Sequence, residues 1–499
     1  MSAGNPEGIA GRALRGLAWA YGSYAGGRVL TLVSTAILAR LLAPSDFGLV
    51  ALALTFIALL ETLSDLGVSQ ALVIVKRETE EKAETVFAIS VAVGAVLALL
   101  VALCGLVAAP FFDAPELRAI LPVLGLNLLI RSLGTTHYAL AQKSIEFRSR
   151  TAAELGDVVA RGVVGIALSL AGFGAWSLVI GYVAGSVIFS ATLFTLVPWR
   201  PRFSPRRRDV RELMSFGGTL TLVNILAALI ANVDYLIVAR VLGQTALGLY
   251  SLAFRLPELL VLNLSVVAGR VLFPAFATLD PPALGRAFLM SLRYTLVISL
   301  PLATVLVLLA APVIDATFGG QWNGSVDSMR LLALYALSIT VAIPAGSAYK
   351  ATGRANVLLI LAIPRAVALV VAVLLVVDQG ILAVAICQTA VACVFDAIGI
   401  VLASRLLGVG LRAIFAASWA PVVAAAGMAT VVLGIDVLVD GSVPTVLIAP
   451  LVGGVAYLGL IRLLLPDVFA GVRSMLRPVP PPPPPSPGGE PPQTATASV

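Results

Sequence analysis

Charged side chains are scarce in this chain. They make up 12% of its 499 residues, whereas hydrophobic residues make up 59%. A soluble domain carries about 25% charged residues, and a soluble fold of this size could not bury so much apolar surface. We therefore expect an all-α polytopic membrane protein with lipid as its solvent. The net charge of +7 does not indicate a nucleic-acid partner, because the basic residues fall in short loops on one predicted side of the membrane.

Cysteine and histidine are almost absent, which leaves little material for a disulfide framework or a metal site. Cys104, Cys387 and Cys393 lie in apolar segments, are odd in number and lack CxxC spacing, so we predict buried free thiols. The single histidine, His137, lies near a predicted helix end. We interpret it as structural, with a proton relay as the alternative.

Catalytic motifs are missing as well. The chain contains no GxSxG elbow, no phosphate-binding P-loop, no histidine-rich metal cluster and no repeated carboxylate motif. We therefore predict no enzyme activity, no cofactor and no bound metal. Any transport by this chain is then not driven by an ATPase of its own.

Long apolar runs are what the chain has instead. A span needs about 20 mostly apolar residues. Fourteen such runs occur, at residues 18–42, 46–72, 84–110, 115–141, 151–172, 174–198, 212–242, 245–273, 284–311, 326–350, 355–377, 379–404, 412–435 and 443–465. Only Gly172-Phe173-Gly174 separates the fifth run from the sixth, and only Gly243-Gln244-Thr245 separates the seventh from the eighth. Such glycine-containing links suit tight turns.

Basic residues alternate between the loops. The loops after even-numbered runs hold most of the Lys and Arg residues, above all the segment 199–211, whereas the loops after odd-numbered runs are poor in base and carry Asp113, Asp315 and Asp378. By the positive-inside rule, this alternation places both termini in the cytoplasm. The segment 199–211 is expected to lie on the anionic inner leaflet.

One motif occurs twice, 200 residues apart and without a gap. Ala-Arg-Leu-Leu at 39–42, Gly-Leu at 48–49 and Leu-Ala at 52–53 return as Ala-Arg-Val-Leu at 239–242, Gly-Leu at 248–249 and Leu-Ala at 252–253. A repeat at fixed spacing indicates two homologous halves. Each half has six spans and so enters the membrane from the same side, which predicts a parallel repeat about an axis along the membrane normal.

The predicted organisation is therefore two homologous six-helix lobes followed by two C-terminal helices. The segments are a cytoplasmic N-terminus (1–17), an N-terminal lobe (18–198), a basic cytoplasmic linker (199–211), a C-terminal lobe (212–404), spans thirteen and fourteen (405–465) and a cytoplasmic tail (466–499). Six consecutive prolines at 480–485 predict a disordered, partly polyproline tail.

Four arginines stand out among the charges at membrane depth. Arg28, Arg131, Arg293 and Arg365 have no acidic residue three or four positions away, and two fall in each half. A charge at the helix centre costs about 2.5–3.5 kcal/mol, so each should face protein or water. Facing one cleft, the four would form a cationic cavity for an anionic, phosphate-bearing substrate. The alternative for each is a snorkelling or locally paired side chain.

The remaining intramembrane charges are candidates for ion coupling or for pairing between lobes. They are Asp65, Asp157, Arg161, Asp234, Arg255, Glu258 and Asp396, with Glu61 as a further intramembrane acid. Asp157 and Arg161 are four residues apart and share one helix face. Arg255 and Glu258 flank Pro257, which should kink the eighth span. The alternative role for both pairs is to join helices.

Two stretches resemble a known family. LARLLAPSDFGLVALALTFIALLETLSDLGVSQALV at 38–73 and NVDYLIVARVLGQTALGLYSLAFRLPE at 232–258 are similar to Wzx-type polysaccharide flippases of the multidrug/oligosaccharidyl-lipid/polysaccharide exporter superfamily. The resemblance implies two lobes that open alternately to each side of the cytoplasmic membrane, driven by an ion gradient. It implies undecaprenyl-pyrophosphate-linked oligosaccharide as substrate, with membrane lipids and the polysaccharide polymerase and chain-length machinery as partners.

Three alternatives stay open at this point. A multidrug or organic-cation antiporter of the same fold predicts an acidic cavity with few arginines. A membrane glycosyltransferase or polymerase would call for acidic catalytic motifs and a large hydrophilic loop. A flippase of the peptidoglycan precursor carries a pyrophosphate too, so the chemistry alone does not separate it from the polysaccharide branch.

Overall fold

The computed structural model describes residues 26–64, 72, 79–144, 146–202, 207–439 and 441–467, and every regular element in these ranges is a helix. The first half contains a helix over residues 26–41, α2 (Pro44–Ser64), α4 (Thr79–Phe111), α5 (Leu117–Lys143), α6 (Phe147–Leu170) and α7 (Ala175–Leu196). The second half contains α8 (Arg207–Pro257), η1 (Glu258–Leu262), α9 (Asn263–Ala277), α10 (Pro281–Leu308), α11 (Ala310–Thr317), η2 (Gly320–Ser325), α12 (Val326–Ala351), α13 (Asn356–Val376), η3 (Val377–Gln379), α14 (Ile381–Leu406), α15 (Leu411–Leu438) and α16 (Ser442–Leu464).

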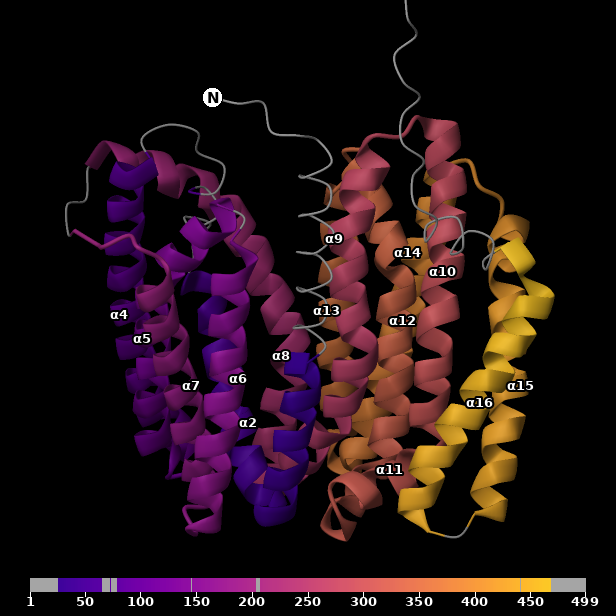
Figure 1. The fold of residues 1–499 in the computed structure, drawn as a ribbon, viewed down its shortest axis with the longest axis horizontal. Coiled ribbons are helices and arrows are strands. Elements are labelled where there is room, and N and C mark those ends of the chain that lie inside the picture. Colours follow the sequence, from indigo (N-terminus) through magenta and orange to yellow (C-terminus); the bar gives the residue numbers. More distant parts are fainter. Residues whose placement is uncertain are drawn as a thin grey trace, which may run out of the picture.

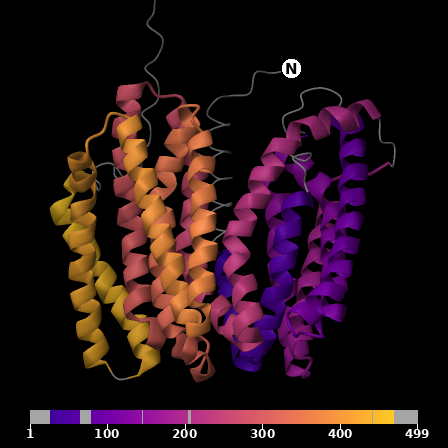
Figure 2. The same ribbon diagram turned by 180° about the vertical axis from the view of Figure 1, so that it is seen from behind.

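The helices gather in two bundles that stand side by side. Figure 1 shows α4 to α7 in one bundle and α9, α10 and α12 to α16 in the other, and Figure 2 shows the same separation from behind. Helices α2 and α8 lie between the bundles and pack extensively against each other. We call the end that holds the loops 143–147, 197–202 and 351–356 the linker end, and the opposite end, where α11 lies, the far end.

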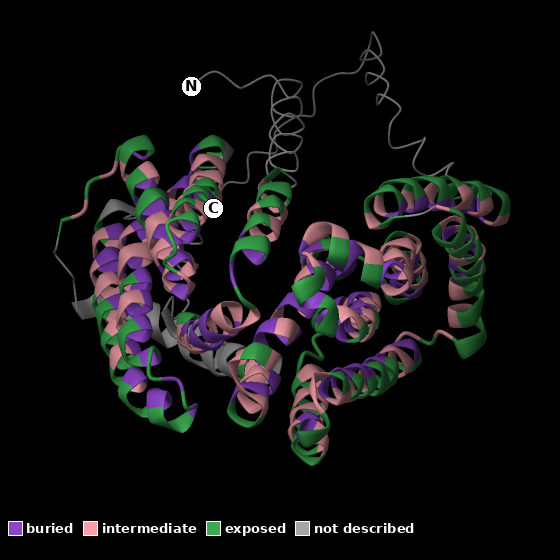
Figure 3. Ribbon diagram, turned by 90° about the horizontal axis from the view of Figure 1, so that it is seen from below, coloured by how far each residue is buried: buried purple, intermediate pink, exposed green. Residues whose placement is uncertain are grey.

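The outer faces of both bundles are apolar. Figure 3 shows exposed residues on the outward sides of the helices and buried ones inside each bundle. Large hydrophobic side chains are among the most exposed, such as Leu375 at 76% and Leu463 at 79%. A soluble protein does not display such a surface, and it matches a hydrocarbon surrounding.

Eleven helical segments in the described ranges are long and apolar enough to cross a membrane, whereas the sequence predicted fourteen spans. Three places account for the difference. The helix at 26–41 is described over too few residues, α6 carries Glu154, Asp157 and Arg161 along its length, and Asn232–Leu262 counts as one segment. Fourteen spans therefore stay a prediction.

The long helix α8 is two helices joined at a glycine. Gly243 has φ 83° and ψ −178°, which lies outside the helical region and which glycine adopts without a Cβ clash. A straight helix of 51 residues would measure about 77 Å, more than twice the thickness of a bilayer core. The break falls at the predicted tight turn Gly243-Gln244-Thr245 and sends the chain back toward the linker end.

The two copies of the repeated motif meet in this interface. Gly48 of α2 and Gly248 of α8, which are equivalent positions of the repeat, lie against each other. A Cβ on Gly48 would overlap the carbonyl oxygen of Gln244, and a Cβ on Gly248 would overlap that of Pro44. Only glycine therefore allows the backbones of α2 and α8 to approach this closely.

The cysteines and the histidine are found inside helices. All three cysteines are free thiols, but Cys393 is exposed and Cys104 and Cys387 are half-buried, so the prediction that they are buried was wrong. The reason is that an apolar segment of a membrane protein can turn its side chains outward to lipid. His137 is buried, donates from Nε2 to the Trp199 carbonyl at 3.2 Å and packs against the Phe194 ring, which fits the structural interpretation.

Candidate functional site

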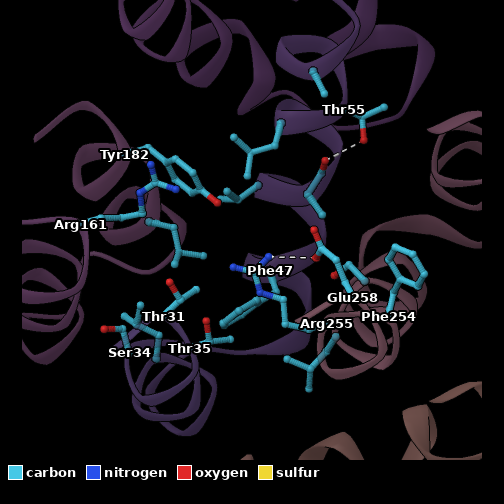
Figure 4. A pocket seen from close by; sticks show the side chains of 18 of the residues that line it. Thr31, Ser34, Thr35, Phe47, Thr55, Arg161, Tyr182, Phe254, Arg255 and Glu258 are labelled. Carbon is cyan, nitrogen blue, oxygen red and sulfur yellow. Dashed lines mark hydrogen bonds and ion pairs between the residues drawn. The ribbon is translucent and has the colours of Figure 1, made fainter. Parts of the chain in front are cut away.

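A cavity of about 360 Å³ lies between the α4–α7 bundle and α8. Its walls come from the helix at 26–41, α2, α6 and α7 on one side and from α8 and the first residue of η1 on the other. Figure 4 shows its charged and aromatic lining residues converging on one space. The polar and aromatic lining residues are Thr31, Ser34, Thr35, Phe47, Thr55, Arg161, Tyr182, Asn232, Tyr235, Ser251, Phe254, Arg255 and Glu258.

Arg161 provides the positive charge on one wall. Its Nη2 donates to both carboxylate oxygens of Asp157, at 2.9 and 3.0 Å, one helical turn away on α6. Its guanidinium also lies over the ring of Tyr182 from α7, 4.0 Å from the centroid. The Nε of Arg161 is buried and has no hydrogen-bond partner among the described residues. The guanidinium is thus held in place while part of its donor capacity remains unused.

Arg255 provides the positive charge on the opposite wall. Its Nη1 pairs with Glu258 Oε2 at 3.2 Å, and both side chains face the cavity in Figure 4. Pro257 lies between them and lacks an N–H, and the π-helical turn η1 begins directly after it. Such turns are common at functional sites, because they change the direction in which side chains point.

Both arginines lie near the middle of the membrane-spanning length. Arg161 is nine residues before the end of α6 at Leu170, and Arg255 is twelve residues beyond the turn at Gly243. At 1.5 Å per residue these positions are about 14 and 18 Å from the far end. A bilayer core is about 30 Å thick, so a ligand that binds both would be held near its midplane.

A second cavity of about 320 Å³ lies within the first bundle. Glu61, Arg131, Tyr138, Glu154 and Phe189 are among its lining residues. Arg131 Nη1 donates to Asp157 Oδ2 at 3.3 Å, and its Nε lies 4.0 Å from Glu61 Oε1. Asp157 therefore pairs with Arg131, which lines this cavity, and with Arg161, which lines the first cavity. It links the arginines of the two cavities.

The four arginines predicted to form one cationic cavity do not line a common site. Arg131 belongs to the second cavity, and Arg365 of α13 pairs with Asp396 of α14 at 2.9 Å. The description of these two as unpaired was wrong, because their partners lie on neighbouring helices rather than one turn away in sequence. Arg28 lies near the start of the helix at 26–41, and Arg293 lies on α10 with its Nε buried and unpaired within the described residues.

The predicted acidic residues are likewise spread over the molecule. Asp234 is buried on α8, where the Tyr250 hydroxyl donates to it at 2.8 Å and the Tyr235 N–H at 3.0 Å. Asp396 accepts from Arg365 and, at 2.8 Å, from the Ser338 hydroxyl. Asp65 lies outside the described residues. Across the ranges that the structure describes, no three His, Cys, Asp or Glu side chains come close enough to hold a metal ion.

Sequence reasoning missed most of the polar lining. Thr31, Ser34 and Thr35 are spaced by three and four residues, which places them on one face of a helix, and all three line the cavity. That spacing in an otherwise apolar run is a signal that could have been read. The position of Tyr182 over Arg161 had no such signal, because the two residues come from different helices.

The far end of the cavity is closed by contacts of the helix at 26–41 and of α2 with α11 and η2. The Trp322 indole Nε1 of η2 donates to the Ala39 carbonyl at 2.8 Å, and the ring of Trp322 meets Phe47 edge-on at 5.1 Å. Arg40 in turn donates from Nε to the Thr317 carbonyl at 3.1 Å and from Nη2 to the Ala316 carbonyl at the end of α11. Phe47 also lines the cavity, so these contacts form its floor.

Comparison with known proteins shows which family the chain belongs to. A family described as "Polysaccharide biosynthesis protein" matches residues 37–327, which is more than half of the chain. The chain is 30% identical over 359 residues to the succinoglycan biosynthesis transport protein ExoT of Rhizobium meliloti (strain 1021), covering 71% of this chain and 72% of that one. It is 28% identical over 336 residues to the lipopolysaccharide biosynthesis protein WzxC of Escherichia coli (strain K12), covering 66% and 68%.

The fold is shared with solved transporters. The lipid II flippase MurJ in an inward closed conformation matches with a TM-score of 0.71 over 90% of this chain and 99% of its own, at 14% identity. An inward-facing multidrug resistance MATE family transporter matches with a TM-score of 0.61 over 76% and 94%, at 16% identity. The similarity to the transport protein ExoT and these two shared folds together place the chain among multi-pass membrane transporters rather than enzymes. The chain belongs to the polysaccharide biosynthesis protein family, which confirms the family-level resemblance found in the sequence.

Proposed function

We propose that this chain moves an undecaprenyl-pyrophosphate-linked oligosaccharide from the inner to the outer leaflet of the cytoplasmic membrane. The observation that carries the proposal is the placement of Arg161 and Arg255 on opposite walls of one cavity at mid-membrane depth. Guanidinium groups stay charged and match phosphate oxygens in a bidentate geometry. The pyrophosphate would bind between them, and the polyprenyl tail would stay in lipid.

The names of the relatives support a surface polysaccharide as the product. The curated proteins that this chain resembles are named for lipopolysaccharide, succinoglycan and teichuronic acid biosynthesis. We propose exopolysaccharide, capsule or O-antigen assembly as the pathway class. The polysaccharide polymerase and the chain-length machinery are the proposed partners, since they act on the translocated repeat unit.

The proposed mechanism is alternating access. Two six-helix lobes, at 18–198 and 212–404, would rock against each other about the central cavity, with the linker end and both termini in the cytoplasm. Fourteen spans, including the two at 405–465, belong to this proposal. Coupling to an ion gradient would use the intramembrane carboxylates Asp65, Asp157, Asp234 or Asp396.

The four sequence-predicted arginines take different places in the proposal. Arg28 and Arg293 are proposed as secondary contacts for the phosphate along its path. Arg131 is proposed to act through Asp157, whose Oδ2 lies 3.3 Å from Arg131 Nη1. Arg365 is proposed to act through Asp396, whose Oδ1 lies 2.9 Å from Arg365 Nη1.

The competing functions predict a different cavity or a different lipid. An organic-cation antiporter predicts an acidic cavity with few arginines, whereas this cavity is lined by two arginines and by one carboxylate, Glu258. A flippase of the peptidoglycan precursor would use the same pyrophosphate contacts. It is distinguished by which lipid accumulates in its absence.

The test is an export assay in cells that lack the protein. Lipid-linked saccharide is extracted and its sidedness measured, and the cells are complemented with wild type, R161Q, R255Q or the double variant. We expect trapped cytoplasmic lipid-linked repeat units and lost surface polysaccharide without the protein. The double variant should fail to restore export although it reaches the membrane.

Arg330→Gln is the matched control, because Arg330 is an exposed arginine that pairs with Asp327 outside the cavity, at 2.8 Å. It should complement like wild type. Normal export from the R161Q/R255Q variant would refute the binding site. Normal surface polysaccharide in the deletion strain, together with new drug sensitivity, would favour the antiporter instead.

A further inference from the structure

We propose that Asp157 is a positioning residue for Arg161. It pairs with Arg161 while the cavity is empty and releases Arg161 when the pyrophosphate of the substrate binds. Arg131 then keeps the Asp157 charge paired. This inference rests on the proposed function and adds how the binding arginine is released. Asp157 itself is not a lining residue of the first cavity, so it acts only through Arg161.

Asp157 is enclosed between helices, whereas the Arg161 side chain extends into the cavity. The Asp157 side chain is 11% exposed, and Gly185 of α7 packs so closely that a Cβ there would overlap Asp157 Oδ1. A Cβ on Gly181 of α7 would lie 2.9 Å from the Arg161 carbonyl oxygen, so the α7 backbone is close to α6 there as well. The carboxylate therefore lies in a closed slot between α6 and α7. The Arg161 side chain, 32% exposed, reaches from that slot across Tyr182 into the cavity.

The number of charges makes an exchange possible. Two arginines share one buried carboxylate, with Arg161 at 2.9 Å and Arg131 at 3.3 Å from its oxygens. A buried carboxylate that lost its single partner would carry an uncompensated charge and would strongly destabilise the folded protein. Because Asp157 has two partners, it stays paired when a phosphate oxygen takes over Arg161.

The donor geometry allows the phosphate to approach before the ion pair opens. Both hydrogen bonds to Asp157 come from Nη2, so the other terminal nitrogen of Arg161, Nη1, takes no part in this ion pair. A guanidinium can bind two anions through different edges of its planar fork. Transfer of Arg161 from Asp157 to phosphate can therefore proceed through a shared intermediate without an unpaired charge.

The experiment is equilibrium titration of the purified full-length protein with inorganic pyrophosphate, repeated with undecaprenyl pyrophosphate in the same detergent. Asp157→Asn keeps the shape but removes the competing charge, so the Kd should fall by roughly tenfold, as for the loss of one charged hydrogen-bond competitor. Arg131→Gln leaves Asp157 with Arg161 alone, so the Kd should rise by about threefold or more. A merely structural role would move both variants in the same direction.

The double variant D157N/R131Q separates direct exchange from general electrostatics. Its net charge equals that of wild type, but Arg161 has no competitor, so tight binding should persist. A return to the wild-type Kd would overturn the exchange. So would weaker or unchanged binding by D157N with either ligand, provided that the variant keeps the wild-type unfolding temperature.

A second variant covers the case in which D157N does not fold. Glu61→Gln removes the charge of a carboxylate that is 52% exposed and lies 4.0 Å from Arg131, so Arg131 should hold Asp157 more firmly and release Arg161. Binding should tighten, and an unchanged or weaker affinity would overturn the proposal. If R161Q and R255Q leave pyrophosphate binding intact, the proposed function itself fails. If R161Q and R255Q abolish pyrophosphate binding but D157N and R131Q do not shift the Kd in opposite directions, only the exchange at Asp157 is refuted.

Discussion

Arg40 and Arg240 occupy equivalent positions of the repeat, yet they bind different kinds of acceptor across the far end. Arg40 donates to the carbonyls that end α11 in the other bundle, beside the fully buried Trp322. Arg240 pairs with the Asp113 carboxylate at 3.4 Å, and these side chains are 49% and 83% exposed. The closure of the far end is therefore asymmetric. On one side the exposed Arg40 and the buried Trp322 donate to backbone carbonyls, and on the other Arg240 forms an exposed ion pair.

The buried Trp322, with its contacts to Ala39 and Phe47, should contribute most of the stability of this closure. Trp322→Ala removes an indole that is 0% exposed, its edge-on contact with Phe47 and its hydrogen bond to Ala39, so we expect a loss of about 3–5 kcal/mol. Arg240→Gln should change stability by less than about 1 kcal/mol, because it breaks an exposed pair. Thermal unfolding of the detergent-purified protein measures both. Equal losses would show that the asymmetry seen in the contacts has no energetic counterpart.

The contact of Gly48 with Gly248 should tolerate no side chain. Gly48→Ala places a methyl group against the backbone of α8, which cannot yield as a flexible side chain would. We expect about 1–3 kcal/mol of destabilisation from overpacking and a lower unfolding temperature.

Gly454→Ala on α16 is the control for that substitution, because a Cβ there meets nothing within 4 Å. It should leave the unfolding temperature unchanged or raise it slightly, since alanine favours helix. If Gly48→Ala and Gly454→Ala behaved alike, the close approach of α2 to α8 would not be a feature of the stable state.

The sequence was informative wherever one helix determines the geometry. The predicted pairs Asp157–Arg161 and Arg255–Glu258, spaced by four and three residues, form at 2.9 and 3.2 Å. The break at Gly243 followed from a tight link between two apolar runs. Each of these features depends on helical periodicity or on bilayer thickness, which a sequence carries by itself.

Contacts between helices could not be predicted from the sequence. Arg131 and Arg365 looked unpaired because Asp157 and Asp396 lie on other helices. In a membrane protein, the face turned to lipid and the face turned to protein are both apolar, so hydropathy does not fix how each helix is rotated. For that reason the sequence did not show that Arg131 and Arg365 are separated from the first cavity, or that Arg161 and Arg255, predicted for ion coupling or pairing, line it.

A buried hydroxyl should contribute to the stability of the α8 hairpin. Tyr250→Phe removes the donor that binds Asp234 at 2.8 Å and leaves a buried carboxylate with the Tyr235 N–H. We expect a loss of about 1–2 kcal/mol, since interhelical hydrogen bonds in membranes are of modest strength. The measurement is again the unfolding temperature. The double variant Y250F/D234N should lose less than Y250F alone, because the orphaned charge is then gone.

The Arg365–Asp396 pair offers the last test, because pairing and coupling predict different results. The two side chains are 21% and 10% exposed, and their atoms lie 2.9 Å apart. Arg365→Gln or Asp396→Asn alone leaves a mostly buried charge without its partner, so each should destabilise the protein by about 3–5 kcal/mol.

The double variant R365Q/D396N removes both charges and should recover most of that loss, with a coupling energy between the two sites of about 1 kcal/mol or more in a double-mutant cycle. If the pair only joins α13 to α14, export should recover together with stability. If Asp396 also carries a coupling ion, stability should return while export does not, because the neutral amide cannot exchange a charge across the membrane. Additive single losses, without recovery in the double variant, would mean that the two side chains do not stabilise each other.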